Sequence, residues 1–192
     1  MSREQQILDV AERLFSERSF DGVGVDDIGR ALGLSASVIY RHFGGKDEVL
    51  AALFDQVIDG LLATLGPPEP DPHQELVRLV TAFQEFTARY DRLTSIWIRE
   101  ERSLSERHHR EYARRRTRFT QRWVDCLERC YSHRSTDELV SAARGAQLLL
   151  VSDAIRPPGG RRSPLAGALL CEMALAGLAV LAAEPEQQQQ TS

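Results

Sequence analysis

Apolar residues recur every three or four positions along this chain, the spacing typical of helices that bury one face. The first such stripe predicts a helix from about Arg3 to Arg18. Another stripe begins near Lys46 and ends before the proline-rich segment GPPEPDP, residues 66–72. No alternating strand pattern follows that segment, so the chain is predicted to be all-α. The first stripe consists of Ile7, Val10, Ala11, Leu14 and Phe15.

The proline-rich segment divides the chain. Before it we expect a head at 1–47 and a linking helix at 47–65; after it we expect a larger helical domain at 66–185 and a disordered tail at 186–192. Ser135 and Glu138 have the spacing of a capping box, which starts a helix. The helices expected in the second domain cover about 72–90, 93–102, 105–132, 135–155 and 164–183.

The last of these helices contains LAGALLCEMALAGLAVLAA, a segment nearly as long as a bilayer is thick. Glu172 lies at its centre, and many of its residues are only alanine or glycine. No second hydrophobic segment of this kind exists in the sequence. We therefore expect a helix buried against protein and no membrane partner.

Residues 25–46, VDDIGRALGLSASVIYRHFGGK, predict two short helices joined by a tight turn. Gly33 permits the left-handed backbone conformation that ends the first helix, and Ser35 is a suitable N-cap for a second helix over 36–42. This arrangement is the helix-turn-helix, whose second helix can enter a DNA major groove. The spacing alone also allows an ordinary helical corner whose polar residues meet only water.

Three segments extend this pattern: ILDVAERLFSE, VDDIGRALGLS and SVIYRHFGGKDEVL. From Ile7 to Leu53 they resemble the N-terminal domain of the TetR family of transcriptional regulators, and IYRHF followed by GGKDEVL is the most specific part. The resemblance implies a three-helix DNA-binding domain followed by a helical ligand-binding and dimerisation domain. It also implies a homodimer, a palindromic operator in double-stranded DNA, and a small-molecule effector that releases a repressor from it.

The second helix of the motif has few apolar anchors, which leaves its polar side chains free for DNA. We expect Tyr40 and Lys46 to contact phosphates, and Ser37, Arg41 and His42 to lie nearer the bases. The predicted DNA-binding set is Ser35, Ser37, Val38, Tyr40, Arg41, His42 and Lys46.

Composition and charge modify this prediction. The net charge is −4, and residues 1–60 hold six cations against eleven acids, so the head is acidic as a whole. This excess favours the rival function, a helical small-molecule-binding or interaction protein with weak or no DNA binding. Three cysteines without a signal peptide predict reduced thiols and a cytoplasmic protein.

Catalytic and metal chemistry have little support. Cys126 and Cys130 share a helix face and His133 follows, but a buried cysteine is more often a small hydrophobe than a ligand. No nucleophile motif, phosphate loop or paired-carboxylate pattern stands out. We expect no enzyme, no metal and no cofactor.

Aromatic residues concentrate in the first half of the second domain, where they form core or line an apolar ligand pocket. Arg116 shares a helix face with Tyr112 and Phe119, so it either holds an acidic group of a ligand or extends to solvent. The candidate ligand-binding set is Phe83, Phe86, Tyr90, Trp97, Tyr112, Arg116, Phe119 and Trp123.

The last two helices are rich in small and apolar residues, which suits a two-fold four-helix interface. A dimer would place two heads on two half-sites one DNA turn apart. The candidate interface consists of Leu139, Ala142, Ala146, Leu149, Leu150, Leu169, Leu170 and Met173.

Overall fold

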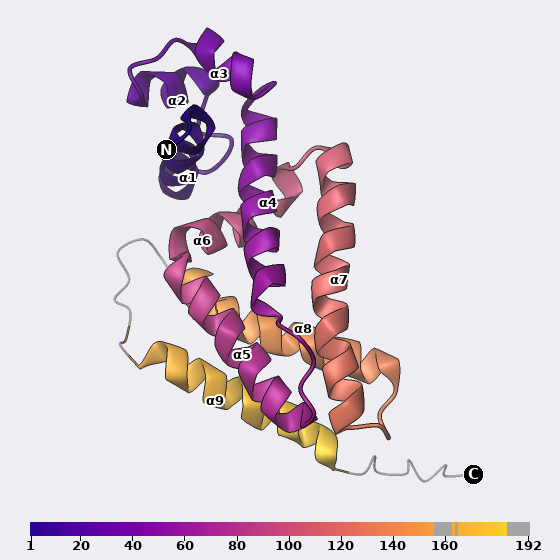
Figure 1. Cartoon of the computed structure of the whole chain (residues 1–192). Coiled ribbons are helices and arrows are strands. Elements are labelled where there is room, and N and C mark those ends of the chain that lie inside the picture. The colour runs from indigo at the N-terminus through magenta and orange to yellow at the C-terminus, as the bar shows by residue number, and fades with distance from the viewer. Residues whose placement is uncertain (156–162, 164, 184–192) are drawn as a thin grey trace, which may run out of the picture.

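The computed structural model describes residues 1–155, 163 and 165–183, and these form helices and turns with no strand. Three short 3-10 turns follow longer helices at Glu101–Ser103, Ser152–Ile155 and Val180–Ala182. The helices are α1 (Arg3–Arg18), α2 (Val25–Ala31), α3 (Ala36–His42), α4 (Lys46–Thr64), α5 (Pro72–Arg89), α6 (Asp91–Glu100), α7 (Glu106–Cys130), α8 (Thr136–Val151) and α9 (Ala166–Ala179) (Figure 1).

Helices α1, α2 and α3 form a head at one end of the molecule (Figure 1). Ile7, Phe15 and Ile28 are fully buried in its core. Gly33 has φ +67° at the turn after α2, the left-handed conformation that glycine adopts without steric cost. At Gly29 a Cβ would lie 2.8 Å from the Leu34 carbonyl oxygen, so the close approach of α2 to the start of α3 requires glycine here.

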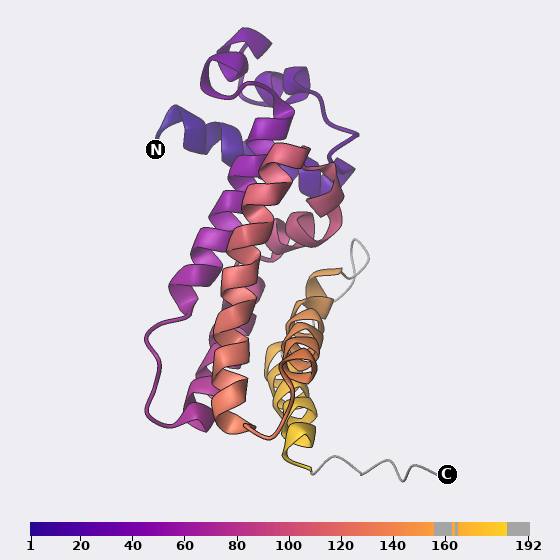
Figure 2. The same ribbon diagram turned by 90° about the vertical axis from the view of Figure 1, so that its right-hand side faces the viewer.

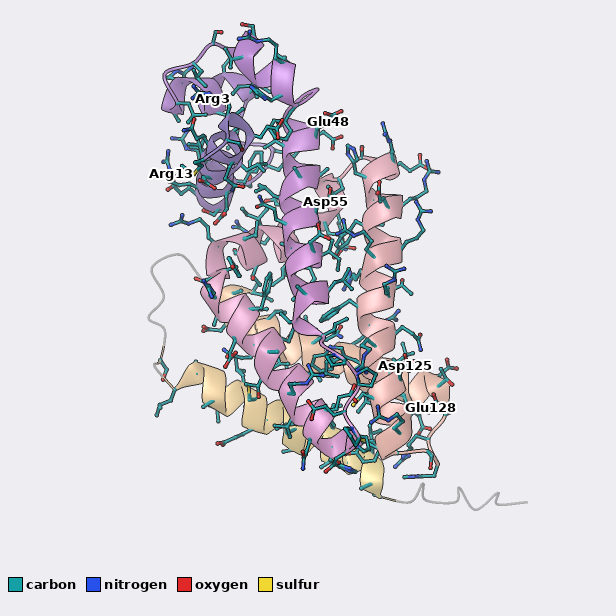
Figure 3. The ribbon with its side chains drawn as sticks, viewed as in Figure 1. Arg3, Arg13, Glu48, Asp55, Asp125 and Glu128 are labelled. Atoms are coloured by element: carbon teal, nitrogen blue, oxygen red, sulfur yellow. The ribbon has the colours of Figure 1, made fainter. Side chains whose placement is uncertain are left out.

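Helix α4 runs from the head into the rest of the molecule, with α7 beside it (Figures 1 and 2). Its buried stripe includes Leu50, Leu53 and Leu61, as the helical spacing predicts. Asp55 and Asp59 on α4 form ion pairs with Arg115 of α7, and Figure 3 shows Asp55 on the α7 side of its helix. Apolar and ionic contacts therefore both join α4 to the second domain.

Helices α5, α7, α8 and α9 pack together at the other end, with α8 and α9 side by side (Figure 2). Phe83 of α5 lies 5.5 Å from Phe119 and 5.8 Å from Trp123, both on α7, between ring centroids. Trp123 is the largest fully buried side chain among the described residues. Aromatic packing at these distances adds specific geometry to the hydrophobic core.

The proline-rich segment is held by charged side chains from the helices that follow. Glu75 is completely buried, accepts a 2.9 Å hydrogen bond from the Glu69 N–H, and pairs with Arg122 and Arg129 of α7. Burial opposes ionisation of Glu75, but these hydrogen bonds outweigh it and the pKa lies below its usual value. The buried charge is therefore paired on both oxygens, which a stable interior requires.

The helices expected from the sequence are confirmed, and the bounds of α1 and α3 are as predicted. Ser135 and Glu138 do form the capping box that starts α8. The helical spacing of Ile28, Ala31 and Leu32 predicts that all three face the core, but Ala31 is exposed. In the described part of the chain, no helix is long and apolar enough to cross a membrane. The predicted tail at 186–192 lies outside the described residues, and the division at residues 47 and 66 stays a prediction.

Candidate DNA-contacting helix and ligand cavity

Helix α3 buries one side chain, Ile39, and presents its polar residues outward. Tyr40 is 56% exposed, and Arg41 and His42 are also exposed. Among the described residues Arg41 has no ion-pair or hydrogen-bond partner, whereas His42 Nδ1 lies 3.6 Å from a Glu4 carboxylate oxygen of α1. The free guanidinium and phenol can therefore reach a nucleic acid without first breaking an internal contact.

The serines and valine of α3 have other surroundings. Ser35 occupies the predicted N-cap position, but its hydroxyl lies 2.8 Å from that of Ser37 and makes no cap hydrogen bond. Val38 is half-buried, so only part of its side chain is accessible. Roles in DNA binding for these three residues stay predictions.

Lys46 lies differently from the sequence-based expectation. Its ammonium donates hydrogen bonds to the Phe20 and Val23 carbonyl oxygens at 3.0 and 3.2 Å. The same group lies 4.2 Å from the centroid of the Phe20 ring, a cation–π distance. Two of its three donors therefore hold the α1–α2 connection onto the start of α4, and the predicted phosphate contact would compete with this structural role.

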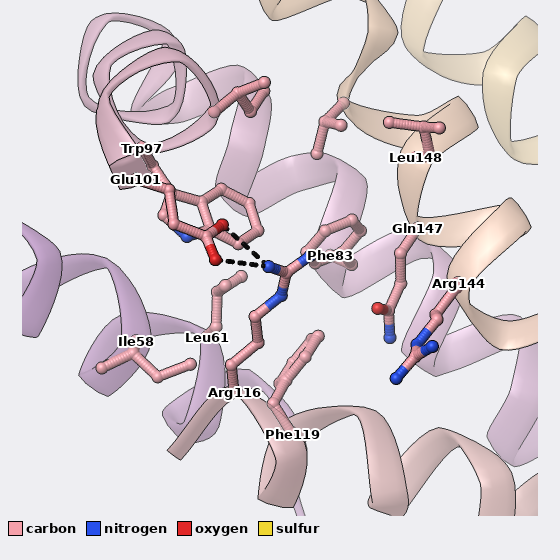
Figure 4. Close-up of a pocket in the computed structure, with 12 residues that line it drawn as sticks. Ile58, Leu61, Phe83, Trp97, Glu101, Arg116, Phe119, Arg144, Gln147 and Leu148 are labelled. Carbon is pink, nitrogen blue, oxygen red and sulfur yellow. Dashed lines mark hydrogen bonds and ion pairs between the residues drawn. The ribbon is translucent and has the colours of Figure 1, made fainter. Parts of the chain in front are cut away.

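A cavity of about 150 Å³ lies in the second domain between α4, α5, α6, α7 and α8. Arg116 reaches across it from α7 and pairs with Glu101 at 2.8 and 3.1 Å (Figure 4). Arg144 and Gln147 approach from α8 on the opposite side (Figure 4). The apolar lining consists of Ile58, Leu61, Phe83, Trp97, Ile98, Phe119, Leu148 and Val151.

Four residues of the predicted ligand-binding set line this cavity, namely Phe83, Trp97, Arg116 and Phe119. The other four lie elsewhere. Tyr112 packs against Phe54 at 5.1 Å, its hydroxyl accepts a hydrogen bond from the Trp97 indole, and burial raises its pKa to about 12. Trp123 is core, Phe86 fills the space beside Gly60, and Tyr90 is 42% exposed.

Sequence reasoning missed the contributions of α4 and α8 to the cavity. Arg144 and Gln147 are three residues apart and therefore share a face of α8. That spacing is a signal the sequence contains, but it acquires meaning only when α8 is known to pack against α7. Leu61 belongs to the core stripe of α4, and with Ile58 it also lines the cavity.

Cys126, Cys130 and His133 do not form a metal site. The Cys126 thiol donates to the Pro72 carbonyl oxygen at 3.3 Å, and burial raises its pKa to about 12. The His133 ring lies instead against the Leu181 carbonyl oxygen at 2.9 Å. The described residues contain no cluster of three potential metal ligands.

The outer face of α8 and α9 is mostly apolar, with one exposed carboxylate, Glu172, on α9. Leu169 and Met173 of α9 are 54% and 48% exposed. Of the predicted interface residues, Ala142, Ala146, Leu149 and Met173 line a hollow of about 250 Å³ on this face. Leu170 is half-buried against the core.

Two of the predicted interface residues point the other way. Leu139 and Leu150 are 1% and 2% exposed because they pack inside the chain's own core. Helix α8 is amphipathic, and Leu139 and Leu150 lie on the face that packs against the core. The residues available for an interface are those on its other face. Any interface on α8 and α9 therefore excludes these two leucines.

Together these features define a helix-turn-helix head joined to a helical domain that contains a cavity. Residues 7–53 match the family model of bacterial regulatory proteins of the tetR family, and residues 69–156 match that of tetracyclin repressor-like C-terminal domains. The chain belongs to the TetR family, a family of DNA-binding transcriptional regulators rather than enzymes.

Known proteins resemble part of the sequence or the fold. The HTH-type transcriptional activator FasR of Mycolicibacterium smegmatis is 31% identical over 87 residues, 44% of this chain and 40% of FasR. The match thus spans well under half of that relative. The crystal structure of PfmR, a TetR family regulator from Thermus thermophilus, has a TM-score of 0.73 and 26% identity over 91% of this chain and 96% of PfmR.

A third similar structure is AibR, solved in complex with isovaleryl coenzyme A and operator DNA. Its TM-score is 0.72 over 91% of this chain and 97% of AibR. At 18% identity the likeness shows the fold alone.

Proposed function

We propose that this protein is a homodimeric, ligand-responsive transcriptional repressor that leaves a palindromic operator when a small apolar or amphipathic ligand binds. The observation that carries the proposal is that two helices, α4 and α6, both line the cavity and contact the head. Helix α4 lines the cavity with Ile58 and Leu61, and its first residue, Lys46, holds the head through backbone carbonyls.

Helix α6 provides the second connection. Trp97 and Ile98 line the cavity, and Arg99 beside them donates to the Phe15 and Ser16 carbonyl oxygens of α1 at 3.4 and 3.2 Å. A ligand that moves α6 therefore moves the end of α1 as well. These two links, through α4 and α6, would make the position of the head sensitive to occupation of the cavity.

A dimer converts that movement into loss of DNA binding. The exposed apolar face of α8 and α9 supports a two-fold interface, and two heads would then bind two half-sites with a fixed spacing. A tilt of α4 or α6 in each copy changes that spacing. The ligand shifts the equilibrium only by its differential affinity for the DNA-incompetent state.

The test is thermodynamic reciprocity. A switch of roughly 5- to 150-fold corresponds to about 1–3 kcal/mol of coupling, and operator DNA must weaken ligand binding by the same factor that ligand weakens operator binding. Ligand affinity is therefore measured by calorimetry with and without a palindromic fragment from the chain's own upstream region. Equal affinities would show that the second domain does not control the head.

The direction of regulation needs its own experiment, because the similar protein FasR carries the name of an activator. A reporter gene behind the bound promoter fragment should be silent with this protein and active when ligand is added. Higher expression with the protein than without it would overturn repression. Absence of a salt-dependent shift with the fragment would favour the rival function, a small-molecule-binding protein whose acidic head does not bind DNA.

A further inference from the structure

We infer that the ligand is an amphipathic anion, with an apolar group of about six carbons in the cavity and an anionic head group anchored by Arg144. The inference rests on the proposed function, since it takes the cavity as the effector site. It adds the chemical class of the ligand and the residue that selects it.

The first observation is the size and lining of the cavity. Its volume is about 150 Å³, and a protein cavity of that size lined by apolar side chains takes a molecule such as benzene. Phe83, Phe119 and Leu61 provide such walls. The space therefore accepts an apolar group of roughly six carbons.

The second observation is a polar groove that continues from the cavity. A groove of about 410 Å³ between α7 and α8 shares three residues with the cavity, namely Glu101, Arg116 and Arg144. The rest of the groove includes the hydroxyls of Thr117 and Thr120. A molecule with its tail in the cavity would pass these shared residues and place its head group in the groove.

The third observation is that the unpaired polar groups at the junction are donors. The Gln147 amide nitrogen is buried without an acceptor, while its oxygen lies 3.4 Å from the Thr120 hydroxyl. No acceptor for the Arg144 guanidinium lies within the described part of the chain. Only the Gln147 donor is buried, and buried donors in native proteins are nearly always satisfied by a bound molecule or by water; the exposed Arg144 guanidinium is free to meet an anion from solvent.

Charge points the same way. The cavity and the groove are each lined by two arginines and one carboxylate, an excess of one positive charge. Glu101 neutralises Arg116 through both of its oxygens, which leaves Arg144 as the uncompensated charge. A carboxylate or a phosphate would balance it, and planar guanidinium groups bind both.

The first experiment measures binding without DNA, so that its failure is distinct from failure of the regulatory function. The full chain is titrated with hexanoate, hexyl phosphate, 1-hexanol and hexylamine, and the fluorescence of its two tryptophans, Trp97 and Trp123, is followed. At least one anion should bind about tenfold or more tightly than hexanol, and hexylamine more weakly than hexanol. The ratio of hexanoate to hexyl phosphate affinity separates a carboxylate from a phosphate head group.

Hexanol binding as tightly as both anions, or no binding of either anion, would overturn the inference. Equally tight binding of hexanol would indicate a neutral effector, which is still compatible with the proposed regulatory function. A ligand that binds but fails to change operator affinity would instead contradict the proposed function.

Two substitutions with opposite expected signs identify the anchor. Arg144→Gln should weaken anion binding about tenfold and leave hexanol affinity unchanged, whereas Glu101→Gln should tighten anion binding several-fold by releasing Arg116. Arg118→Gln is the matched control, because Arg118 is exposed on α7 and lines neither hollow. An Arg144→Gln protein with wild-type anion affinity, or a Glu101→Gln protein with no gain, would overturn the assignment.

Discussion

Helices α3 and α9 bury few side chains within the chain, yet their exposed surfaces differ in kind. Helix α3 buries Ile39, and α9 buries Ala174 and Leu178. Tyr40 on α3 and Leu169 on α9 are 56% and 54% exposed, so the extent of exposure does not distinguish the two helices. What distinguishes them is the chemistry of the exposed side chains.

Helix α3 exposes groups that form hydrogen bonds, which remain well solvated until a polar, anionic partner replaces water. Helix α9 exposes the apolar side chains of Leu169 and Met173 and shares an apolar hollow with α8, and apolar surfaces of this kind mark protein–protein contacts. Two weakly buried helices at opposite ends of one chain therefore suit a nucleic acid and a second copy of the chain. Substitutions on α3 or on α9 can test each of these two assignments separately.

The largest effect is expected at α9. Leu169→Glu combined with Met173→Glu places two charges in the proposed interface, where burying an unpaired charge costs several kcal/mol. The protein should sediment as a monomer and lose most of its operator affinity, because one head alone binds a single half-site.

Val77→Glu is the control for this change, since Val77 is also an apolar residue, 48% exposed, but lies on α5. It should leave the oligomeric state unchanged. A double variant of α9 that stays dimeric would show that the apolar face of α8 and α9 is not the interface.

At the other end, Arg41→Ala tests whether the exposed groups of α3 contact DNA. Loss of a well-formed base contact should weaken specific binding by about 1–3 kcal/mol, measured by fluorescence anisotropy with the operator fragment. Binding to a scrambled fragment should change less. Arg89→Ala on α5 is the control, and an equal loss on both fragments would assign Arg41 to phosphate rather than base contact.

The contrast between these helices could be predicted from sequence because it is local. Polar residues crowd α3, small and apolar residues crowd α9, and neither assignment needs knowledge of a neighbour. The helix bounds were predictable for the same reason, since stripes, caps and the proline-rich break act within a few residues.

What could not be predicted depends on packing between distant segments. The cavity takes residues from α4 through α8, and of its lining only Phe83, Trp97, Arg116 and Phe119 were predicted from the sequence. Leu139 and Leu150 were predicted to be interface residues. The helical repeat of apolar residues shows which side chains share a face of α8, but it does not show whether that face packs against the core or against a second copy. The contacts of Lys46 with Phe20 and Val23 span more than twenty residues, a distance at which local patterns carry no information.

A substitution at Lys46 tests whether this cation of the head contacts DNA or only stabilises the head itself. Lys46→Met retains much of the apolar stem but removes the two hydrogen bonds, and it should lower the free energy of unfolding by about 1–2 kcal/mol. The slope of operator affinity against salt should then stay unchanged. A slope reduced by about one unit with unchanged stability would instead restore the phosphate contact predicted from sequence.

The smallest effect is expected on the pH dependence of stability, through the buried carboxylate of Glu75. Because hydrogen bonds keep the pKa of Glu75 below the value of 4.5 expected in the unfolded chain, this carboxylate stabilises the fold above pH 4.5. That contribution is lost as the pH falls through the folded-state pKa. Glu75→Gln should therefore show a shallower loss of stability below pH 4.5 than the wild type, measured by urea unfolding at several pH values.

Glu128→Gln supplies the control for that measurement, since Glu128 is an exposed carboxylate on α7 (Figure 3). It should keep the wild-type pH dependence, because the Glu128 carboxylate is exposed to solvent and is not buried between arginines as Glu75 is. The Glu75→Gln protein is expected to be less stable at neutral pH, where Arg122 and Arg129 lose their charged partner. If the free energy of unfolding of the Glu75→Gln protein had the same pH dependence as that of the wild type, protonation of other carboxylates would account for the loss of stability in acid.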